Sequence, residues 1–322
     1  MGECIVAVTD NRHASYDIER EILKQAGIEL AVLDCETEDD VIRKCADMDG
    51  LLLDMAPMSA RVVQALRRCR VINRYGVGYD NVDVEACTRK GIWVTNVPDY
   101  CAEDVSDHAV ALLLSCLRQT ALRDRLVRAG QWNVHGQTSY RVCGKTLGVL
   151  GAGRIARALI RKMQGFALKE VLVYDPYVDA ASIATLRARK CGLDELLAAS
   201  DFVSLHMPVT PETRGMINRQ TLRLMKPSAI LINTGRGPLV DDPALIDALQ
   251  SHKIAGAGLD THTVEPLPAN SPYLVMDSVV LTDHTAYNTA EAVEELKTKS
   301  ARNIVAALGG KTPPYHVNTP AK

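Results

Sequence analysis

The strongest chemical signal in the sequence is a glycine-rich turn directly after an apolar run. Residues 146–150 read TLGVL, and Gly151-Ala152-Gly153-Arg154-Ile155-Ala156 follows as G-x-G-x-x-A. Where such a turn joins a strand to a helix, the first glycine allows the tight turn and the second lets the backbone approach a pyrophosphate. The N-terminus of the helix then presents free N–H groups. We therefore expect Gly151 and Gly153 to contact the pyrophosphate of a dinucleotide.

An acid at the end of the next apolar run indicates which dinucleotide binds. Asp175 follows VLVY (171–174), at roughly the 20-residue spacing of the acid that binds the ribose hydroxyls. A carboxylate there repels a 2′-phosphate, and Pro176-Tyr177 supplies no arginine to receive one. These residues predict NAD (NADH) over NADP. The alternative is a tight turn in an α/β domain that binds no nucleotide, with a solvated Asp175.

Three polar residues further along could carry out proton and carboxylate chemistry. Arg236 follows AILI (229–232), Glu265 lies in LDTHTVEP (259–266), and His284 follows VVLT (279–282). The carboxyl ends of parallel strands meet at one sheet edge, so we expect the three to converge. Arginine pairs with a carboxylate, histidine gives a proton to a developing alkoxide, and a neighbouring glutamate stabilises the imidazolium. The set predicts reduction of a 2-keto acid, although singly each residue could be structural or merely solvated.

The elements that position these residues follow from the alternation of apolar runs with segments of helical spacing. Helical spacing is found, for example, over 17–25, 154–163 and 243–250. Apolar strands alternating with helices indicate parallel sheets covered on both faces. Strands are expected at 5–8, 51–53, 71–72, 92–94, 146–150, 171–174, 202–205, 229–232, 255–259 and 279–282.

The length of 322 residues and a break in this pattern indicate two domains. One long helix is expected over about 102–129, with no strand after it until Thr146. A last helix over 289–308 ends at Gly309-Gly310. We therefore expect a substrate domain of 1–99 plus 287–322 and an NAD-binding domain of 100–286.

Composition excludes several classes of partner. Lys+Arg number 37 against Asp+Glu 39, which gives no reason to expect nucleic acid or an anionic membrane surface. No apolar run approaches the roughly 20 residues of a membrane span, and the N-terminus lacks a signal-peptide pattern. The 9 cysteines are scattered without a C-x-x-C pair, which favours reduced thiols over disulfides or a metal site. We expect a cytoplasmic protein without metal.

Six segments spread over about residues 50–310 carry a shared pattern: RYGVGYDNVD (74–83), GKTLGVLGAGRIAR (144–157), SLHMPVTPETRGMIN (204–218), INTGRGPLVDDPAL (232–245), AGLDTHTVEPLP (257–268) and TDHTAYNTAEA (282–292). Together they resemble the D-isomer-specific 2-hydroxyacid dehydrogenase family, above all its C-terminal-binding-protein-like and glyoxylate/hydroxypyruvate reductase branches. The resemblance implies a Rossmann NAD-binding domain inserted into a flavodoxin-like substrate domain. It also implies interconversion of 2-keto and D-2-hydroxy acids, and a homodimer formed through the NAD-binding domain with helix 102–129 as its main contact.

The same resemblance implies roles for single residues. Arg236, Glu265 and His284 match the catalytic residues, and Asp260 matches a residue near the nicotinamide amide. Other residues are expected to contact the cofactor: Arg154, Ile155, His206, Thr213 and Thr234. A last group is expected to contact the substrate: Arg74, Gly76, Val77, Gly78 and Tyr287. In the family, backbone N–H groups of the turn 74–78 are expected to hold the substrate carboxylate. His262, between two threonines, has no evident partner and is expected to be structural.

The loop 54–58 reads DMAPM and lacks the arginine that phosphoglycerate-type members carry near that place. Asp54 would repel a second anionic group, and Met55, Met58 and Tyr287 offer an adaptable apolar surface. We therefore expect uncharged 2-keto acids as substrates. Two alternatives stay open: an NAD(H)-sensing regulatory protein of the C-terminal-binding-protein kind, and a 3-phosphoglycerate dehydrogenase.

Overall fold

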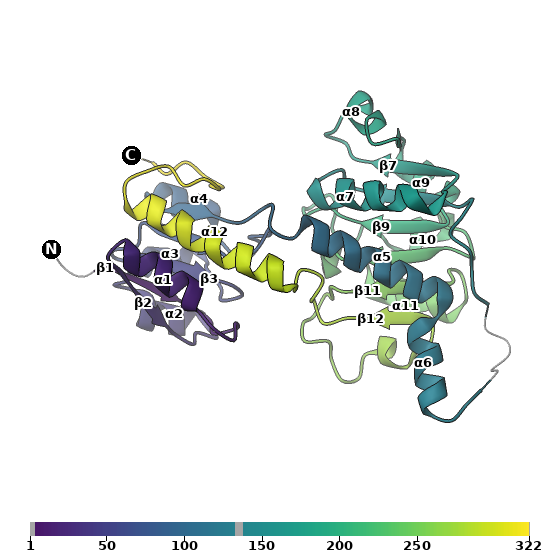
Figure 1. Cartoon of the computed structure of the whole chain (residues 1–322), viewed down its shortest axis with the longest axis horizontal. Helices are drawn as coiled ribbons and strands as arrows, with labels where there is room; N and C mark the ends of the chain where they lie inside the picture. Colours follow the sequence, from purple (N-terminus) through teal and green to yellow (C-terminus); the bar gives the residue numbers. More distant parts are fainter. Residues whose placement is uncertain (1–3, 133–137, 322) are drawn as a thin grey trace. The chain divides into compact units, whose positions relative to one another are not determined.

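The computed structural model describes residues 4–132 and 138–321. The chain forms two compact units (Figure 1). Unit 1 comprises Met1–Tyr100 and Thr289–Lys322, and unit 2 comprises Cys101–Asn288. Each unit contains one parallel sheet with helices on both faces, so the predicted fold class of two doubly wound α/β domains is confirmed.

Unit 1 has a five-stranded sheet in the order β2-β1-β3-β4-β5, which is the flavodoxin-like order. Sequence analysis missed β2, because its alternating burial and the exposed Glu29 do not form an apolar run. The strands are β1 (Cys4–Val8), β2 (Ile28–Val32), β3 (Gly50–Leu53), β4 (Val71–Arg74) and β5 (Trp93–Thr95).

The helices of unit 1 cover both faces of this sheet. Helices α1 and α12 lie side by side on one face, with α2, α3 and α4 on the other (Figure 1). Thr289 caps α12 by accepting a hydrogen bond from the N–H of Ala292 at 3.1 Å, close to the predicted start. The helices are α1 (Asp17–Gln25), α2 (Glu38–Cys45), α3 (Ala60–Ala65), α4 (Val84–Arg89) and α12 (Ala290–Leu308).

Unit 2 has a seven-stranded sheet in the order β12-β11-β10-β9-β6-β7-β8. Chain order reverses between β6 and β9, as in a Rossmann domain with one added edge strand. Only the two-residue β8 escaped prediction, because it is short and basic. The strands are β6 (Thr146–Leu150), β7 (Glu170–Tyr174), β8 (Arg189–Lys190), β9 (Phe202–Leu205), β10 (Ile230–Asn233), β11 (Gly256–Leu259) and β12 (Val279–Leu281).

The single long helix predicted over 102–129 is wrong. Gln119 adopts a left-handed conformation (φ 54°), which ends α5 (Ala102–Arg118) before α6 (Thr120–Arg128) begins. No glycine or proline marks the break in the sequence. The other helices of unit 2 are α7 (Arg154–Met163), α8 (Ala180–Ala184), α9 (Leu193–Ala199), α10 (Arg219–Leu224) and α11 (Asp242–Gln250), with 3-10 turns η1 (Gln164–Phe166), η2 (Gly237–Leu239) and η3 (Pro272–Val275).

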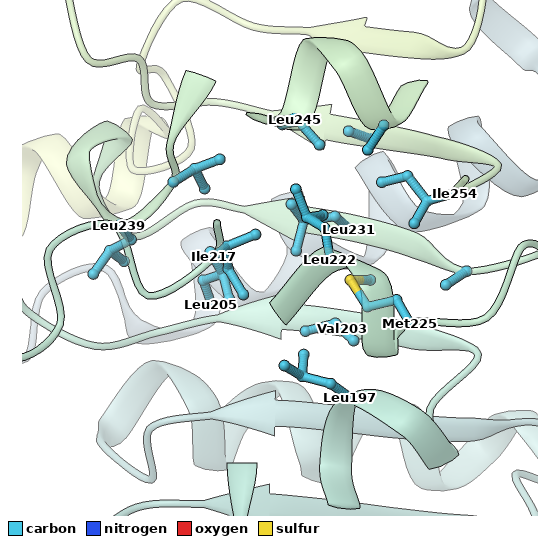
Figure 2. Close-up of a cluster of buried hydrophobic side chains, with 14 of the residues drawn as sticks. Leu197, Val203, Leu205, Ile217, Leu222, Met225, Leu231, Leu239, Leu245 and Ile254 are labelled. Carbon is cyan, nitrogen blue, oxygen red and sulfur yellow. The ribbon is translucent and has the colours of Figure 1, made fainter. Parts of the chain in front are cut away.

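Buried apolar side chains fix the strands of unit 2. In Figure 2, Val203 of β9 and Leu231 of β10 pack against Leu222 of α10. A separate cluster on other sheet residues includes Leu112 of α5. Strands apolar on both faces therefore form a rigid frame, and their carboxyl ends are defined starting points for the loops of the site. No described helix is both long and apolar enough to cross a membrane.

Candidate active site

The glycine-rich turn lies where the strand order of unit 2 reverses, between β6 and β9. Gly151 has φ +96°, and a Cβ there would lie 2.6 Å from the carbonyl oxygen of His206. A side chain at Gly153 would meet nothing within 4 Å. Gly153 also precedes α7 without a side-chain cap, so the N–H groups at Arg154 and Ile155 can bind a phosphate. This turn has the backbone shape and open space that a pyrophosphate requires.

Asp175 follows β7 and is held by the backbone around it. Its carboxylate accepts hydrogen bonds from the N–H groups of Ala152 (2.8 Å), Tyr177 (2.9 Å) and Val178 (3.2 Å). Asp175 therefore also fastens the glycine turn to the end of β7. Sequence analysis missed this second role, because spacing along the chain does not show which N–H groups a carboxylate reaches.

The remaining predicted cofactor residues occupy loops at the same edge of the sheet. The His206 ring bonds Ser204 Oγ at 2.8 Å, and burial lowers the pKa of His206 to about 4, which keeps the ring neutral near pH 7. Thr213 Oγ1 donates to the carbonyl of Pro208 at 2.7 Å.

Two threonine hydroxyls near these loops are buried without a partner in the described part of the chain. They belong to Thr234 and Thr261. Buried polar atoms are nearly always hydrogen-bonded, so an unpartnered hydroxyl points to a ligand. Together with the open space at Gly153, these hydroxyls fit a bound dinucleotide. Thr261 was not predicted; its only signal is its place after the apolar run 255–259.

Glu265 and His284, two of the predicted catalytic residues, are directly hydrogen-bonded. Glu265 Oε2 lies 2.8 Å from His284 Nδ1. A carboxylate only accepts, so Nδ1 carries a proton and Nε2 is left for a substrate. Both side chains remain partly exposed, at 27% and 33%.

The charge on Glu265 is stabilised by two donors. Burial acts to raise the pKa of Glu265, but the hydrogen bonds from the His284 ring and from the His262 N–H (2.8 Å) outweigh it and lower that pKa. Glu265 is therefore ionised near pH 7 and favours a positive charge on its neighbour.

The loop that carries His284 has an unusual backbone conformation fixed by Asp260. His284 has φ +56°, which costs a non-glycine residue on the order of 1 kcal/mol or more. Its N–H donates to the carbonyl of Asp260 at 2.8 Å. The Asp260 carboxylate accepts from Thr282 Oγ1 (2.6 Å) and from the N–H groups of Thr285 (3.0 Å) and Ala286 (3.1 Å). With both oxygens engaged, Asp260 shapes this loop, and its contact with a nicotinamide stays a prediction.

Arg236 lies on the adjoining loop, which follows β10. Asn233 shapes that loop by donating from Nδ2 to the carbonyl of Arg236 (2.9 Å) and accepting at Oδ1 from the N–H of Gly235 (3.1 Å). A Cβ at Gly237 would lie 2.0 Å from the carbonyl carbon of His262. The loop of Arg236 is thus packed onto the loop of Glu265. Asn233 was missed, although a polar residue ending an apolar strand is a visible signal.

The side chain of Arg236 contacts the backbone of its own loop. Its Nη1 donates to the carbonyl of Gly235 at 2.8 Å. The structure thus joins Glu265 to His284 by a hydrogen bond and packs the loop of Arg236 onto the loop of Glu265.

The predicted substrate loop of unit 1 presents free backbone donors. Gly76 has φ +129°, and Asn96 Nδ2 donates to the carbonyl of Val77 at 2.7 Å. Within the described residues, the N–H groups of 76–78 donate to no acceptor. Successive free N–H groups in a turn form a concave site for an anion.

Tyr75 anchors this loop from inside unit 1. Its hydroxyl donates to Glu19 Oε1 at 2.7 Å, and Glu19 is fully buried. Burial raises the pKa of Glu19. Arg74 pairs with Asp54 at 3.6 Å, so Asp54 is not the isolated charge that the sequence suggested.

Two of the three side chains expected to provide the apolar substrate surface remain accessible. Met55 is 45% exposed and Tyr287 is half-buried. The prediction for Met58 is wrong: it is fully buried in the core of unit 1, because the bridge to Val82 turns it inward.

Residues 110–286 match the family model described as the NAD-binding domain of D-isomer-specific 2-hydroxyacid dehydrogenases. A glyoxylate reductase from Korarchaeum cryptofilum is 41% identical over 281 residues, which are 86% of this chain and 84% of that protein. A D-3-phosphoglycerate dehydrogenase from Mycobacterium leprae is 38% identical over 292 residues, 90% of this chain but 55% of that protein.

A solved structure of D-lactate dehydrogenase from Aquifex aeolicus, in complex with NAD and lactic acid, is also similar. It superposes with a TM-score of 0.87 at 26% identity, covering 98% of this chain and 100% of the other. Taken with the glycine turn, the acid after β7 and the two parallel sheets, these matches place the chain in the D-isomer-specific 2-hydroxyacid dehydrogenase family, as an enzyme that uses NAD(H).

Proposed function

We propose that this protein reduces a small 2-keto acid with an uncharged side chain to the D-2-hydroxy acid with NADH, and that His284 is the proton donor. The hydrogen bond between His284 Nδ1 and Glu265 Oε2 carries the proposal. It orients the ring, leaves Nε2 for the substrate and stabilises the imidazolium needed for proton donation.

The predicted site residues have distinct roles in the proposed reduction. Bound NADH supplies the hydride for the carbonyl carbon. His284 Nε2 gives its proton to the carbonyl oxygen as negative charge develops there, and Glu265 stabilises the charged ring before transfer. Arg236 pairs with the substrate carboxylate or polarises its carbonyl. The N–H groups of 76–78 bind the carboxylate.

Charge around the loop 54–58 supports an uncharged substrate side chain. The buried Asp10 carboxylate accepts hydrogen bonds from the N–H groups of Asp54, Met55 and Ala56. Asp10 and Asp54 at this loop each have an arginine partner, Arg12 at 3.7 Å and Arg74 at 3.6 Å. A phosphate or a second carboxylate would have to compete with these two acids for the arginines.

The assembly and location are part of the same proposal. A homodimer formed through unit 2 would cover the apolar side chains of Val127 and Trp132, which are 51% and 77% exposed on and after α6. The nine cysteines are free thiols, as a reducing cytoplasm would keep them.

A panel of 2-keto acids with NADH tests the proposed activity. Glyoxylate, hydroxypyruvate and short aliphatic keto acids should be reduced, with kcat/KM at least about tenfold above that for phosphohydroxypyruvate or 2-ketodicarboxylates, a difference of roughly 1.4 kcal/mol. Absorbance of the reduced nicotinamide measures the rates. A preference for the phosphorylated substrate would instead support a phosphoglycerate dehydrogenase. NADH-dependent capture of a protein without any turnover would support the regulatory alternative.

The proton donor is tested with His284→Asn, because asparagine tolerates the left-handed backbone at this position. Turnover should fall about 100-fold or more, the usual size for loss of a general acid. NADH affinity, measured by fluorescence titration, should persist. His252→Asn is the matched control, since His252 is exposed and also has a positive φ of 55°. Turnover within a few-fold of the unsubstituted enzyme would exclude His284 as donor.

The role of Glu265 is tested through the pH dependence of Glu265→Gln. Removing the negative charge disfavours a positive charge on the neighbouring ring, so the apparent pKa of the reductive reaction should fall. Because the reduction needs the protonated ring, the loss of kcat/KM with rising pH should begin at lower pH than in the unsubstituted enzyme. Initial rates across a pH series measure the shift; an unmoved profile would mean that the carboxylate does not act on the ring.

Cofactor choice is tested with Asp175→Ala. Losing the tie to Ala152 should weaken NADH and NADPH alike, whereas losing the charge should relieve repulsion of the 2′-phosphate only. The ratio of the two affinities should therefore move toward NADPH by about tenfold, measured by titration of both. Asp179→Ala, which removes a nearby capping acid, should leave the ratio unchanged. An unchanged ratio in Asp175→Ala would mean that Asp175 only stabilises the glycine turn and does not select NADH over NADPH.

A further inference from the structure

Thr282 ends the segment before Asp283-His284, and both of its oxygens are bound by histidines. The Nε2 atom of His108, on α5, lies 3.0 Å from Thr282 Oγ1. The Nε2 atom of His262, on the loop after β11, lies 3.0 Å from the Thr282 carbonyl oxygen. The two rings therefore contact Thr282 from separate elements.

The partners of Thr282 determine which proton each ring carries. Its hydroxyl donates to the Asp260 carboxylate at 2.6 Å, so Oγ1 can only accept from His108. A carbonyl oxygen likewise only accepts, so His262 must be the donor to it. Both rings then carry a proton on Nε2.

We propose that His108 and His262 are positioning residues, which hold Thr282 and thereby the loop that carries His284. This rests on the proposed role of His284 as proton donor. His262 acts on both members of the catalytic pair, because its N–H binds Glu265 Oε1 at 2.8 Å while its ring fixes the loop of His284. Such support is needed because His284 is held at φ +56°.

The effect of the two histidines should be on turnover. A displacement of about 1 Å at a reacting group can cost on the order of 100-fold in rate, and neither ring takes part in the proposed contacts of the glycine turn. Loss of either ring should therefore lower kcat while NADH affinity stays the same. A general loss of folding would reduce both together.

Paired substitutions at each histidine separate the hydrogen bond from the volume of the ring. His262→Leu and His108→Leu should lower kcat about tenfold or more, with the Kd for NADH within about twofold. His262→Gln and His108→Gln keep an N–H donor and should stay within about threefold. The control His252→Asn should match the unsubstituted enzyme. Leucine variants with unchanged kcat, or glutamine variants no better than leucine, would overturn the proposal.

A measurement on the unsubstituted protein keeps the inference testable if a variant fails to fold. Nitrogen-15 spectra of the histidine rings, assigned through the glutamine variants, should show His108 and His262 protonated on Nε2 at neutral pH. A ring protonated on Nδ1 alone would refute its contact with Thr282. The spectra need no turnover. A lack of keto-acid reduction would refute the proposed function, whereas both expected signals in the same protein would still support the two contacts with Thr282.

Discussion

The buried carboxylate of Asp260 is the interaction on which the geometry of the site depends. It is 1% exposed, and it accepts three hydrogen bonds from the short loop that follows β12. A buried charge without partners would cost several kcal/mol, so the loop cannot leave this arrangement without exposing or abandoning the carboxylate. The same contacts impose the left-handed backbone of His284, which the local sequence would not adopt by preference. The cost of the left-handed backbone at His284 is thus offset by the hydrogen bonds that the buried Asp260 carboxylate receives.

Other loops follow a similar rule: a polar side chain at or just after the end of one strand fixes the backbone of its own loop or of the loop after an adjacent strand. Asn233 does so for the loop of Arg236, Asp175 for the glycine turn, and Asp10 for the loop after β3. The apolar strands give each loop a fixed start, and the polar side chain gives it a fixed path. Close backbone contact at Gly237 then joins two of these loops.

The contrast between strands set by local apolar runs and loops set by distant polar contacts explains what could be predicted from the sequence. Apolar runs and the G-x-G-x-x-A turn are local patterns, so nearly all strands and the parallel arrangement of both sheets could be predicted from them. The break at Gln119 and the edge strand β2 did not, because tertiary contacts and not local propensity decide them. The inward position of Met58 and the partner of His262 were also out of reach. The His262 ring, for example, bonds a carbonyl 20 positions further along the chain, and no periodicity records such a contact.

The proposed proton-donating pair and the glycine turn both belong to unit 2, whereas the free N–H groups of 76–78 belong to unit 1. The hydrogen bonds that align His284 with Glu265 join residues of unit 2. The predicted substrate loop is shaped by contacts within unit 1, of Tyr75 with Glu19 and of Asn96 with Val77. Substitutions in unit 1 that suit a different substrate side chain therefore need not remove any of the hydrogen bonds that align the proposed proton donor.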